Sequence, residues 1–554
     1  MLNVSQPVVP NAKGTPIVFQ AANPAALWAT LPEKTDSDVI FRITVYSHHF
    51  KVVPLTDIAR KICFSFVRKY IISSTTGPEP VHTAYAASNT AKTWFRFHIN
   101  TLDDWKRFIY EKGYSKAAEY IEKEYFTPTK VALALKDGWK HKPEQEPVRD
   151  YLAAPVGVKD PQSGLYPEGT GAKARLVGIS TGAGKTFCAL AELARRGEVF
   201  VAIVLAQFVG KWVNDIANTL KVDKKEILKV QGSAELKALT EMAVTKGALE
   251  GFKAIVISNR TYENYLRSYE RHENELQDLG YMCKPEELFE KLGAGTRLID
   301  EVHMQFYAQY RLDLYTHVPQ SISLSATLIN KDPEIERIYK TAYPMPERYR
   351  EGPVDKFTDA YAVRYSVNPR WRYKTSYKEP NYSQNAYEES ILKNKEFAVS
   401  YCQMIKTFVQ AGYVRNHEPG HKAIIFCGTV AMCGHLATYL QNAYPQYNVK
   451  RYVAEDPYEE NYKQPDIRVT TIGSGGTGHD VPGMTDAHLT PGLESIQANI
   501  QAFGRLRKIP NKQTRFYFYT NTDIRKHLKY DRSKTQLMRE RAKSLTPIAY
   551  GELY

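Results

Sequence analysis

The chain has 554 residues, 43% of them hydrophobic, and it carries 74 basic against 60 acidic side chains, for a formal net charge of +14. No apolar stretch approaches the roughly 18 residues that a membrane span needs, and residues 1–30 lack the basic start and apolar block of a secretory signal. The six cysteines include no CxxC pair, which argues against a zinc framework or a disulfide scaffold. These features predict a large cytoplasmic protein and no membrane partner.

The first part of the chain predicts a separate α/β module, which we assign to residues 1–137. Residues 38–47 and 93–100 have the composition of strands, and residues 55–72 and 102–114 have helical periodicity. Basic and aromatic side chains interleave in this module, which favours a nucleic-acid-binding accessory domain. The alternative is that the aromatic side chains form the core of a half-buried sheet.

Residues 180–186 (STGAGKT) follow a strand-like segment and precede a helical one, the pattern of a phosphate-binding loop. Glycines let backbone N–H groups turn toward phosphates, Lys185 neutralises the β and γ oxygens, and the Thr186 hydroxyl ligates Mg²⁺. The general pattern has a glycine where this chain has Ile179. The alternative is a chance occurrence of GKT. The loop predicts ATP binding through Thr181, Gly182, Ala183, Gly184, Lys185 and Thr186.

Residues 298–303 (LIDEVH) predict the second half of a nucleotide site. The apolar segment has the character of a strand and ends in two acids. Asp300 is positioned to hold Mg²⁺, and Glu301 to orient and deprotonate the attacking water. The alternative is a solvated surface pair, because polar residues shorten the apolar run expected of a buried strand.

Together, STGAGKT and DEVH resemble motifs I and II of the superfamily 2 DExH-type helicases, and the layout is loosely like that of phage branch-migration DNA helicases of the UvsW type. The resemblance implies that Gln145 reads adenine. It implies that Ser325 and Thr327 of the SAT segment link hydrolysis to strand movement. It also implies nucleic-acid contacts by Gln207, Lys211, Ser258, Asn259 and Arg260.

Further elements of this family resemblance lie in the second half of the chain. Residues 422–429 resemble motif IV, and residues 467–482 resemble motif V, which implies that Thr477 contacts nucleic acid and that Gly478 and Asp480 contact the nucleotide. Residues 501–508 (QAFGRLRK) resemble motif VI, with Gln501 at the nucleotide. Arg505 is the favoured arginine finger and Arg507 the second candidate, because Lys508 stands where the family has its second arginine. Structural salt bridging is the alternative for both.

Two long stretches of the chain contain no recognisable motif. Residues 264–295 predict a charged helical insertion, and residues 330–420 predict a bridge between lobes with a helical part over 384–412.

Basic charge is unevenly distributed along the chain. Residues 1–140 carry 18 basic against 12 acidic side chains, and residues 501–554 carry 13 against 4. The two ends of the chain therefore carry the positive field that a polyanion would meet.

We predict an α/β fold with two RecA-like parallel-sheet lobes in tandem behind the N-terminal accessory domain. The predicted lobes cover residues 138–330 and 331–521, the second with the bridging insertion, and a basic helix covers 522–554. The resemblance implies an ATP- and Mg²⁺-dependent DNA helicase or translocase that remodels forks and junctions with replication or recombination proteins, in the host cytoplasm if a phage encodes it. An RNA helicase and a non-catalytic nucleic-acid-binding protein are the alternatives.

Overall fold

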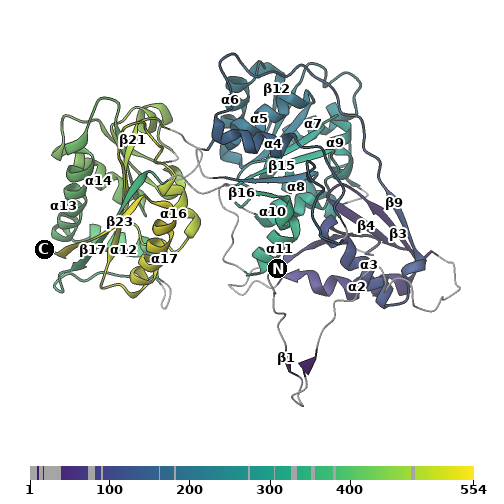
Figure 1. The fold of residues 1–554 in the computed structure, drawn as a ribbon, viewed down its shortest axis with the longest axis horizontal. Helices are drawn as coiled ribbons and strands as arrows, with labels where there is room; N and C mark the ends of the chain where they lie inside the picture. Colours follow the sequence, from purple (N-terminus) through teal and green to yellow (C-terminus); the bar gives the residue numbers. More distant parts are fainter. Residues whose placement is uncertain are drawn as a thin grey trace.

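The computed structural model describes residues 9–10, 16–17, 39–72, 82–88, 92–160, 162–179, 183–272, 275–304, 306–325, 333–350, 356–377, 382–453, 455–475 and 481–554. Three larger sheets organise these residues, one mixed and two parallel (Figure 1). The mixed sheet and the first parallel sheet lie together at one end of the molecule, and the second parallel sheet forms a separate lobe. Within the described residues, no helix has the length and apolar character that a membrane span requires.

The N-terminal sheet has five strands, antiparallel except for the pair β3 and β9. Two helices cover it, α2 (Asp57–Val67) and α3 (Leu102–Glu111). Phe66 and Trp105 pack edge to face between them, with ring centroids 5.1 Å apart. The strands, in sheet order, are β7 (Tyr85–Ala87), β8 (Phe95–His98), β4 (His49–Pro54), β3 (Phe41–Val45) and β9 (Ala118–Glu122).

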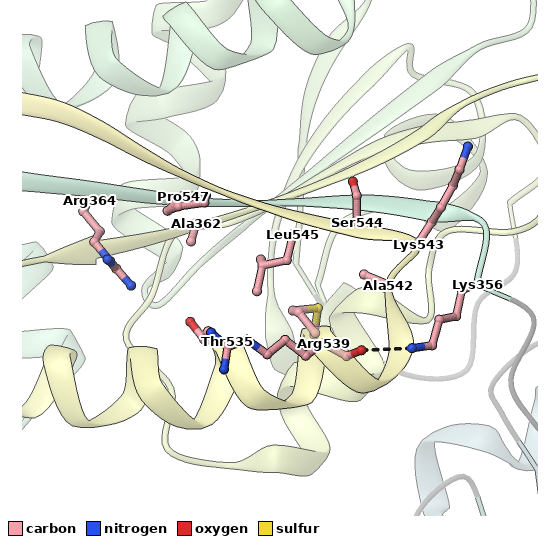
Figure 2. Close-up of a pocket in the computed structure, with 11 residues that line it drawn as sticks. Lys356, Ala362, Arg364, Thr535, Arg539, Ala542, Lys543, Ser544, Leu545 and Pro547 are labelled. Carbon is pink, nitrogen blue, oxygen red and sulfur yellow. Dashed lines mark hydrogen bonds between the residues drawn. The ribbon is translucent and has the colours of Figure 1, made fainter.

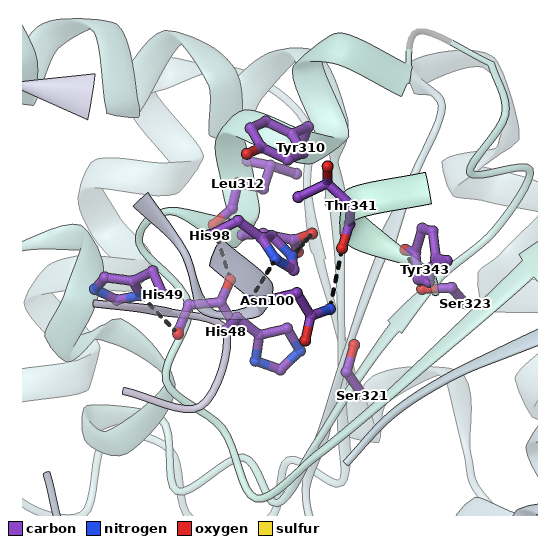
Figure 3. Close-up of polar contacts among 12 residues, drawn as sticks. His48, His49, His98, Asn100, Tyr310, Leu312, Ser321, Ser323, Thr341 and Tyr343 are labelled. Carbon is purple, nitrogen blue, oxygen red and sulfur yellow. Dashed lines mark hydrogen bonds and ion pairs between the residues drawn. The ribbon is translucent and has the colours of Figure 1, made fainter. Parts of the chain in front are cut away.

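Most of the interleaved basic and aromatic side chains of this module are buried, as the core-packing alternative predicts. Trp94 is 3% exposed and joins the core of the first lobe, and Arg96 is fully buried with its Nη2 2.6 Å from Glu286 Oε1. Figure 3 shows further polar contacts across the same boundary, where the His49 ring lies 3.2 Å from the Thr316 carbonyl oxygen. The module is therefore docked on the first lobe through both apolar and polar side chains.

The first lobe is built on a seven-stranded, all-parallel sheet. Helices cover both faces because the strand residues are apolar on both sides, as parallel sheets require. In sheet order the strands are β12 (Ile227–Val230), β13 (Ala254–Ser258), β11 (Phe200–Val204), β14 (Thr296–Ile299), β15 (Gln320–Ser325), β10 (Ala174–Gly178) and β16 (Arg348–Arg350). The helices are α4 (Glu146–Ala153), α5 (Lys185–Arg196), α6 (Val209–Thr219), α7 (Ser233–Val244), α8 (Asn259–Arg271), α9 (Leu288–Lys291), α10 (Phe306–Asp313) and α11 (Pro333–Ala342).

The second lobe repeats this plan with another seven-stranded parallel sheet. In sheet order its strands are β19 (Val449–Tyr452), β20 (Ile467–Thr471), β18 (Lys422–Cys427), β21 (Met484–Leu489), β22 (Thr514–Asn521), β17 (Thr358–Val367) and β23 (Ser544–Leu553). The helices are α12 (Gln384–Leu392), α13 (Lys395–Gly412), α14 (Val430–Ala443), α15 (Ile472–Gly475), α16 (Ile496–Phe503) and α17 (Arg525–Arg541). The two tandem parallel sheets confirm the predicted fold class.

Several predicted elements have different limits in the structure. The sheet of the first lobe extends to residue 350, because β16 pairs with β10. The helix predicted over 384–412 is two helices, because the Asn394 side chain accepts a hydrogen bond from the Phe397 N–H and begins a new helix. The helix predicted over 522–554 ends at Arg541, and β23 follows it and pairs with β17. The insertion predicted over 264–295 holds the end of α8 and the short helix α9.

Candidate nucleotide site

The carboxyl ends of three neighbouring strands converge at one edge of the first sheet. Gly178, the last residue of β10, pairs with Ser325, the last residue of β15, and Ile299 at the end of β14 pairs with Ser323. The segments that follow these strands are the phosphate loop, DEVH and SAT. Open parallel sheets bind ligands at this edge, so the topology brings the three predicted motifs together.

The described part of the phosphate loop has the geometry of a helix N-terminal anion site. Gly184 caps α5 with a φ of +88°, in the left-handed region, and a Cβ there would lie 2.1 Å from Gln145 Nε2. Lys185, the first residue of α5, is buried, and its Nζ donates to the Ile179 carbonyl oxygen at 3.0 Å. Ala183 and Thr186 are partly buried. Thr181 and Gly182 lie outside the described residues.

Gln145 lies against this loop from the turn that precedes α4. Its Nε2 donates to the Ala183 carbonyl oxygen at 3.1 Å, and its Oε1 accepts from the Lys142 N–H at 3.1 Å. The amide therefore braces the backbone of the phosphate loop. The contact with adenine stays a prediction.

Asp300 follows β14 and is 9% exposed. Its carboxylate accepts hydrogen bonds from Trp212 Nε1 and from the Glu301 N–H, both at 2.9 Å. Burial and the neighbouring Glu301 raise the pKa of Asp300 to about 6, against the opposing charges of Lys211 and Lys185. These interactions place the predicted phosphate-binding lysine close to the predicted magnesium ligand.

Glu301 and His303 connect DEVH to the SAT segment. Glu301 has a φ of +48°, a left-handed conformation that is uncommon for a residue with a side chain and that is concentrated at functional sites. His303 Nδ1 lies 3.4 Å from Glu301 Oε2 and 2.7 Å from Ser325 Oγ. Burial and the nearby Lys185 lower the pKa of His303 to about 4, so its ring is neutral at physiological pH. The sequence prediction assigned no role to His303 or Trp212.

The predicted nucleic-acid contacts of the first lobe also lie at this edge of the sheet. Val204 at the end of β11 pairs with Ser258 at the end of β13, and Gln207 and Arg260, just beyond them, are exposed. Lys211 is partly buried and its Nζ lies 2.8 Å from Asp215 Oδ2. Three predicted contacts are therefore accessible at this edge, namely Gln207, Lys211 and Arg260.

The remaining predicted nucleic-acid residues are less accessible or undescribed. Ser258, Asn259 and Ser325 are each 3% exposed or less, so direct contact through these side chains requires a conformational change. Thr327 and Thr477 lie outside the described residues.

The predicted residues of the second lobe cluster around the end of α16. Gln501 and Arg505 are buried, and Arg507 Nη1 donates to the carbonyl oxygens of Gly504 and Leu506. In Figure 1, α16 lies on the side of the second lobe that is nearer to the first. Gly478 and Asp480 lie outside the described residues.

The side chains at the edge of the first sheet fit a magnesium nucleotide. The start of α5 and Lys185 offer positive charge to phosphates. The Thr186 hydroxyl and the Asp300 carboxylate are hard oxygen ligands of the kind that Mg²⁺ prefers. A bound divalent cation would stabilise the charged form of Asp300, whose pKa burial raises.

No protein-family model and no curated protein sequence matches this chain. The solved structures that are similar to this chain include the following three. Mss116p, in a structure bound to ssRNA and AMP-PNP, has 14% identity and a TM-score of 0.44 over 68% of this chain and 71% of its own. A fragment of a putative HsdR subunit of a type I restriction enzyme from Vibrio vulnificus has 13% identity and a TM-score of 0.42 over 74% and 72%. T4 UvsW has 12% identity and a TM-score of 0.28 over 92% and 99%. The chain itself has two tandem lobes, each built on a seven-stranded parallel sheet.

Proposed function

We propose that the chain is an ATP-dependent DNA helicase or translocase that remodels branched DNA in replication, recombination or repair. The observation that carries the proposal is the convergence of Lys185, Asp300 and Glu301 at the carboxyl edge of one parallel sheet. Asp300 is buried there, and its pKa responds to both Lys185 and Glu301. Phosphate binding, metal binding and water activation are thus available in one place.

Each side chain has a distinct task in this proposal. Lys185 and the N-terminus of α5 hold the phosphates, and Thr186 and Asp300 hold Mg²⁺, which supplies charge neutralisation when bound. Glu301 orients the attacking water and takes its proton. His303 lies between Glu301, at 3.4 Å, and Ser325 at the end of β15, with which it forms a hydrogen bond of 2.7 Å.

The second lobe supplies the motion in this proposal. Arg505, with Arg507 as the second candidate, stabilises charge that develops on the γ-phosphate only in the transition state. A nucleotide that gains contacts when both lobes surround it favours closure, and hydrolysis removes those contacts. Nucleic acid held by both lobes then moves by one step per cycle.

The choice of DNA over RNA rests on the family resemblance alone, so the test compares substrates directly. ATP hydrolysis is measured with single-stranded DNA, duplex DNA, a replication fork, a four-way junction and RNA of matched length. We expect the largest stimulation by the fork or the junction. Larger stimulation by RNA would establish the alternative RNA helicase, and no phosphate release with any substrate would establish a non-catalytic binding protein.

A further inference from the structure

A second candidate site lies in the second lobe, between α17 and the strands β17 and β23. A pocket of about 490 Å³ is present there (Figure 2). The pocket is lined by four basic side chains and no acidic one, namely Lys356, Arg364, Arg539 and Lys543. In Figure 2, Arg364 points from β17 toward α17, and Lys543 points away from the helix at the rim. The side chains that line the pocket therefore carry positive charge and no negative charge.

Two buried polar atoms on the pocket wall have no hydrogen-bond partner among the described residues. These atoms are Arg364 Nε and the Thr535 hydroxyl oxygen. Arg364 Nη2 lies 2.8 Å from Asp531 Oδ2, and Asp531 also accepts a hydrogen bond from Thr520 at 3.1 Å. Nη2 of the guanidinium is thus engaged by Asp531, whereas Nε is a buried donor that has no hydrogen-bond partner among the described residues. A guanidinium beside a hydroxyl is a donor set that suits an oxyanion.

The location separates this pocket from the candidate nucleotide site. Its strand residues are Ala362 and Arg364 in the middle of β17, and Ser544, Leu545 and Pro547 in the first half of β23. The predicted motif V segment begins with β20, the second strand from one edge of the same parallel sheet, whereas β17 and β23 are the last two strands at the other edge. A group bound in this pocket would therefore lie apart from the nucleic-acid strand that motif V is predicted to contact.

We propose that this pocket binds a backbone phosphate of nucleic acid, as a second contact for a branched substrate. The proposal takes its ligand class from the proposed function. A phosphodiester oxygen accepts from Arg364 Nε and from the Thr535 hydroxyl, and Arg539 and Lys356 add positive charge. A free phosphate or a nucleotide phosphate offers the same chemistry, so the test must distinguish these sources.

The test uses two substitutions in the full chain, Arg539→Ala and Thr535→Val, with Arg532→Ala as the matched control. Arg532 is an exposed arginine of the same helix that does not line the pocket. Affinity for a labelled fork is measured by fluorescence anisotropy over a salt series. We expect Arg539→Ala to reduce the slope of log affinity against log salt by about 1, as the loss of one phosphate contact does. Thr535→Val should weaken fork binding with little change in slope, because it removes a neutral donor.

Equal slopes and affinities for Arg539→Ala and Arg532→Ala would overturn the proposal. A second arm measures inorganic phosphate binding by calorimetry. If Arg539→Ala abolishes phosphate binding but leaves fork affinity and slope at the parental values, the pocket serves a free phosphate and the proposal is wrong. ATP hydrolysis by the unmodified chain is measured in parallel. A chain without ATPase activity that still shows the Arg539-dependent slope would refute the proposed motor and leave the pocket assignment standing.

Discussion

Asp300 shows how its surroundings define the role of a single carboxylate. Burial and Glu301 favour its protonated form, while Lys211, Trp212 and Lys185 favour its charged form, and the pKa is about 6 as a result. Such a group is mostly ionised at neutral pH, yet it carries an unfavourable desolvation energy that a metal ion would relieve. Perturbed carboxylates of this kind concentrate at functional sites.

The proposed chemistry predicts that Lys185→Ala and Glu301→Gln each abolish nucleic-acid-stimulated ATP hydrolysis. The expected loss for Lys185→Ala is roughly 10²- to 10³-fold, the range for removing a preorganised charge stabiliser. Phosphate release measures it, and Lys224→Ala, at an exposed lysine of the same lobe, is the control. Hydrolysis at the parental rate by Glu301→Gln would show that another group activates the water.

The arginine assignment predicts a different outcome for Arg505→Ala. The substitution should lower kcat while leaving nucleotide affinity close to the parental value, because the interaction is made only in the transition state. Arg507→Ala is the comparison, and the larger kcat defect identifies the finger. Loss of nucleotide binding by Arg505→Ala would indicate a structural role for that side chain.

The raised pKa of Asp300 predicts a pH dependence of stability in the absence of Mg²⁺ and nucleotide. The folded state binds the proton of Asp300 more tightly than the unfolded state does, so the contribution of Asp300 to stability is largest below about pH 4 and is lost as the pH rises through about 6. Asp300→Asn should remove a penalty of about 3 kcal/mol at pH 7. Thermal unfolding between pH 4 and pH 7 measures the difference. An unchanged slope in the variant would mean that Asp300 is solvated in the free protein.

At the scale of the element, β14 is buried although it contains Arg297. The guanidinium is 1% exposed, with Nη2 2.6 Å from Asp313 Oδ1 on α10 and Nη1 2.7 Å from Thr316 Oγ1. Burial alone would raise the pKa of Asp313, but Arg297 holds it well below its usual value. The partner on α10 therefore lets this strand lie inside the lobe, directly before Asp300.

Removing that partner should destabilise the lobe. We expect Asp313→Ala to lower the free energy of unfolding by about 3 to 5 kcal/mol, because it leaves a buried charge without its partner. Chemical denaturation measures the change, and Asp278→Ala at an exposed site is the control. A change no larger than that of the control would show that water or the remaining hydroxyl partners compensate Arg297.

At the scale of the molecule, basic charge is concentrated toward the two ends of the chain, which fold into different bodies. The N-terminal module is docked on the first lobe, and the C-terminal segment supplies α17 and β23 of the second lobe. A polyanion held by both lobes would meet positive charge from each.

This distribution predicts a steep salt dependence of nucleic-acid binding. A protein that contacts six or more phosphates loses roughly 10³-fold or more in affinity between 50 and 200 mM salt. Anisotropy titrations with a fork measure this dependence. An affinity independent of salt would show that the basic ends do not contact the backbone.

The sequence, through its resemblance to the superfamily 2 helicases, was sufficient to predict the two tandem parallel-sheet lobes. The roles assigned to STGAGKT and DEVH stay predictions. The resemblance is carried by short segments, in which glycines, apolar strand residues and adjacent carboxylates follow one another over a few positions. Chain contacts beyond that range were not predictable. The position of Gln145 on the phosphate loop, the bond between His303 and Ser325 and the pairing of β23 with β17 are of this kind. They join segments that are far apart in the sequence, so only the packing of the folded chain decides them.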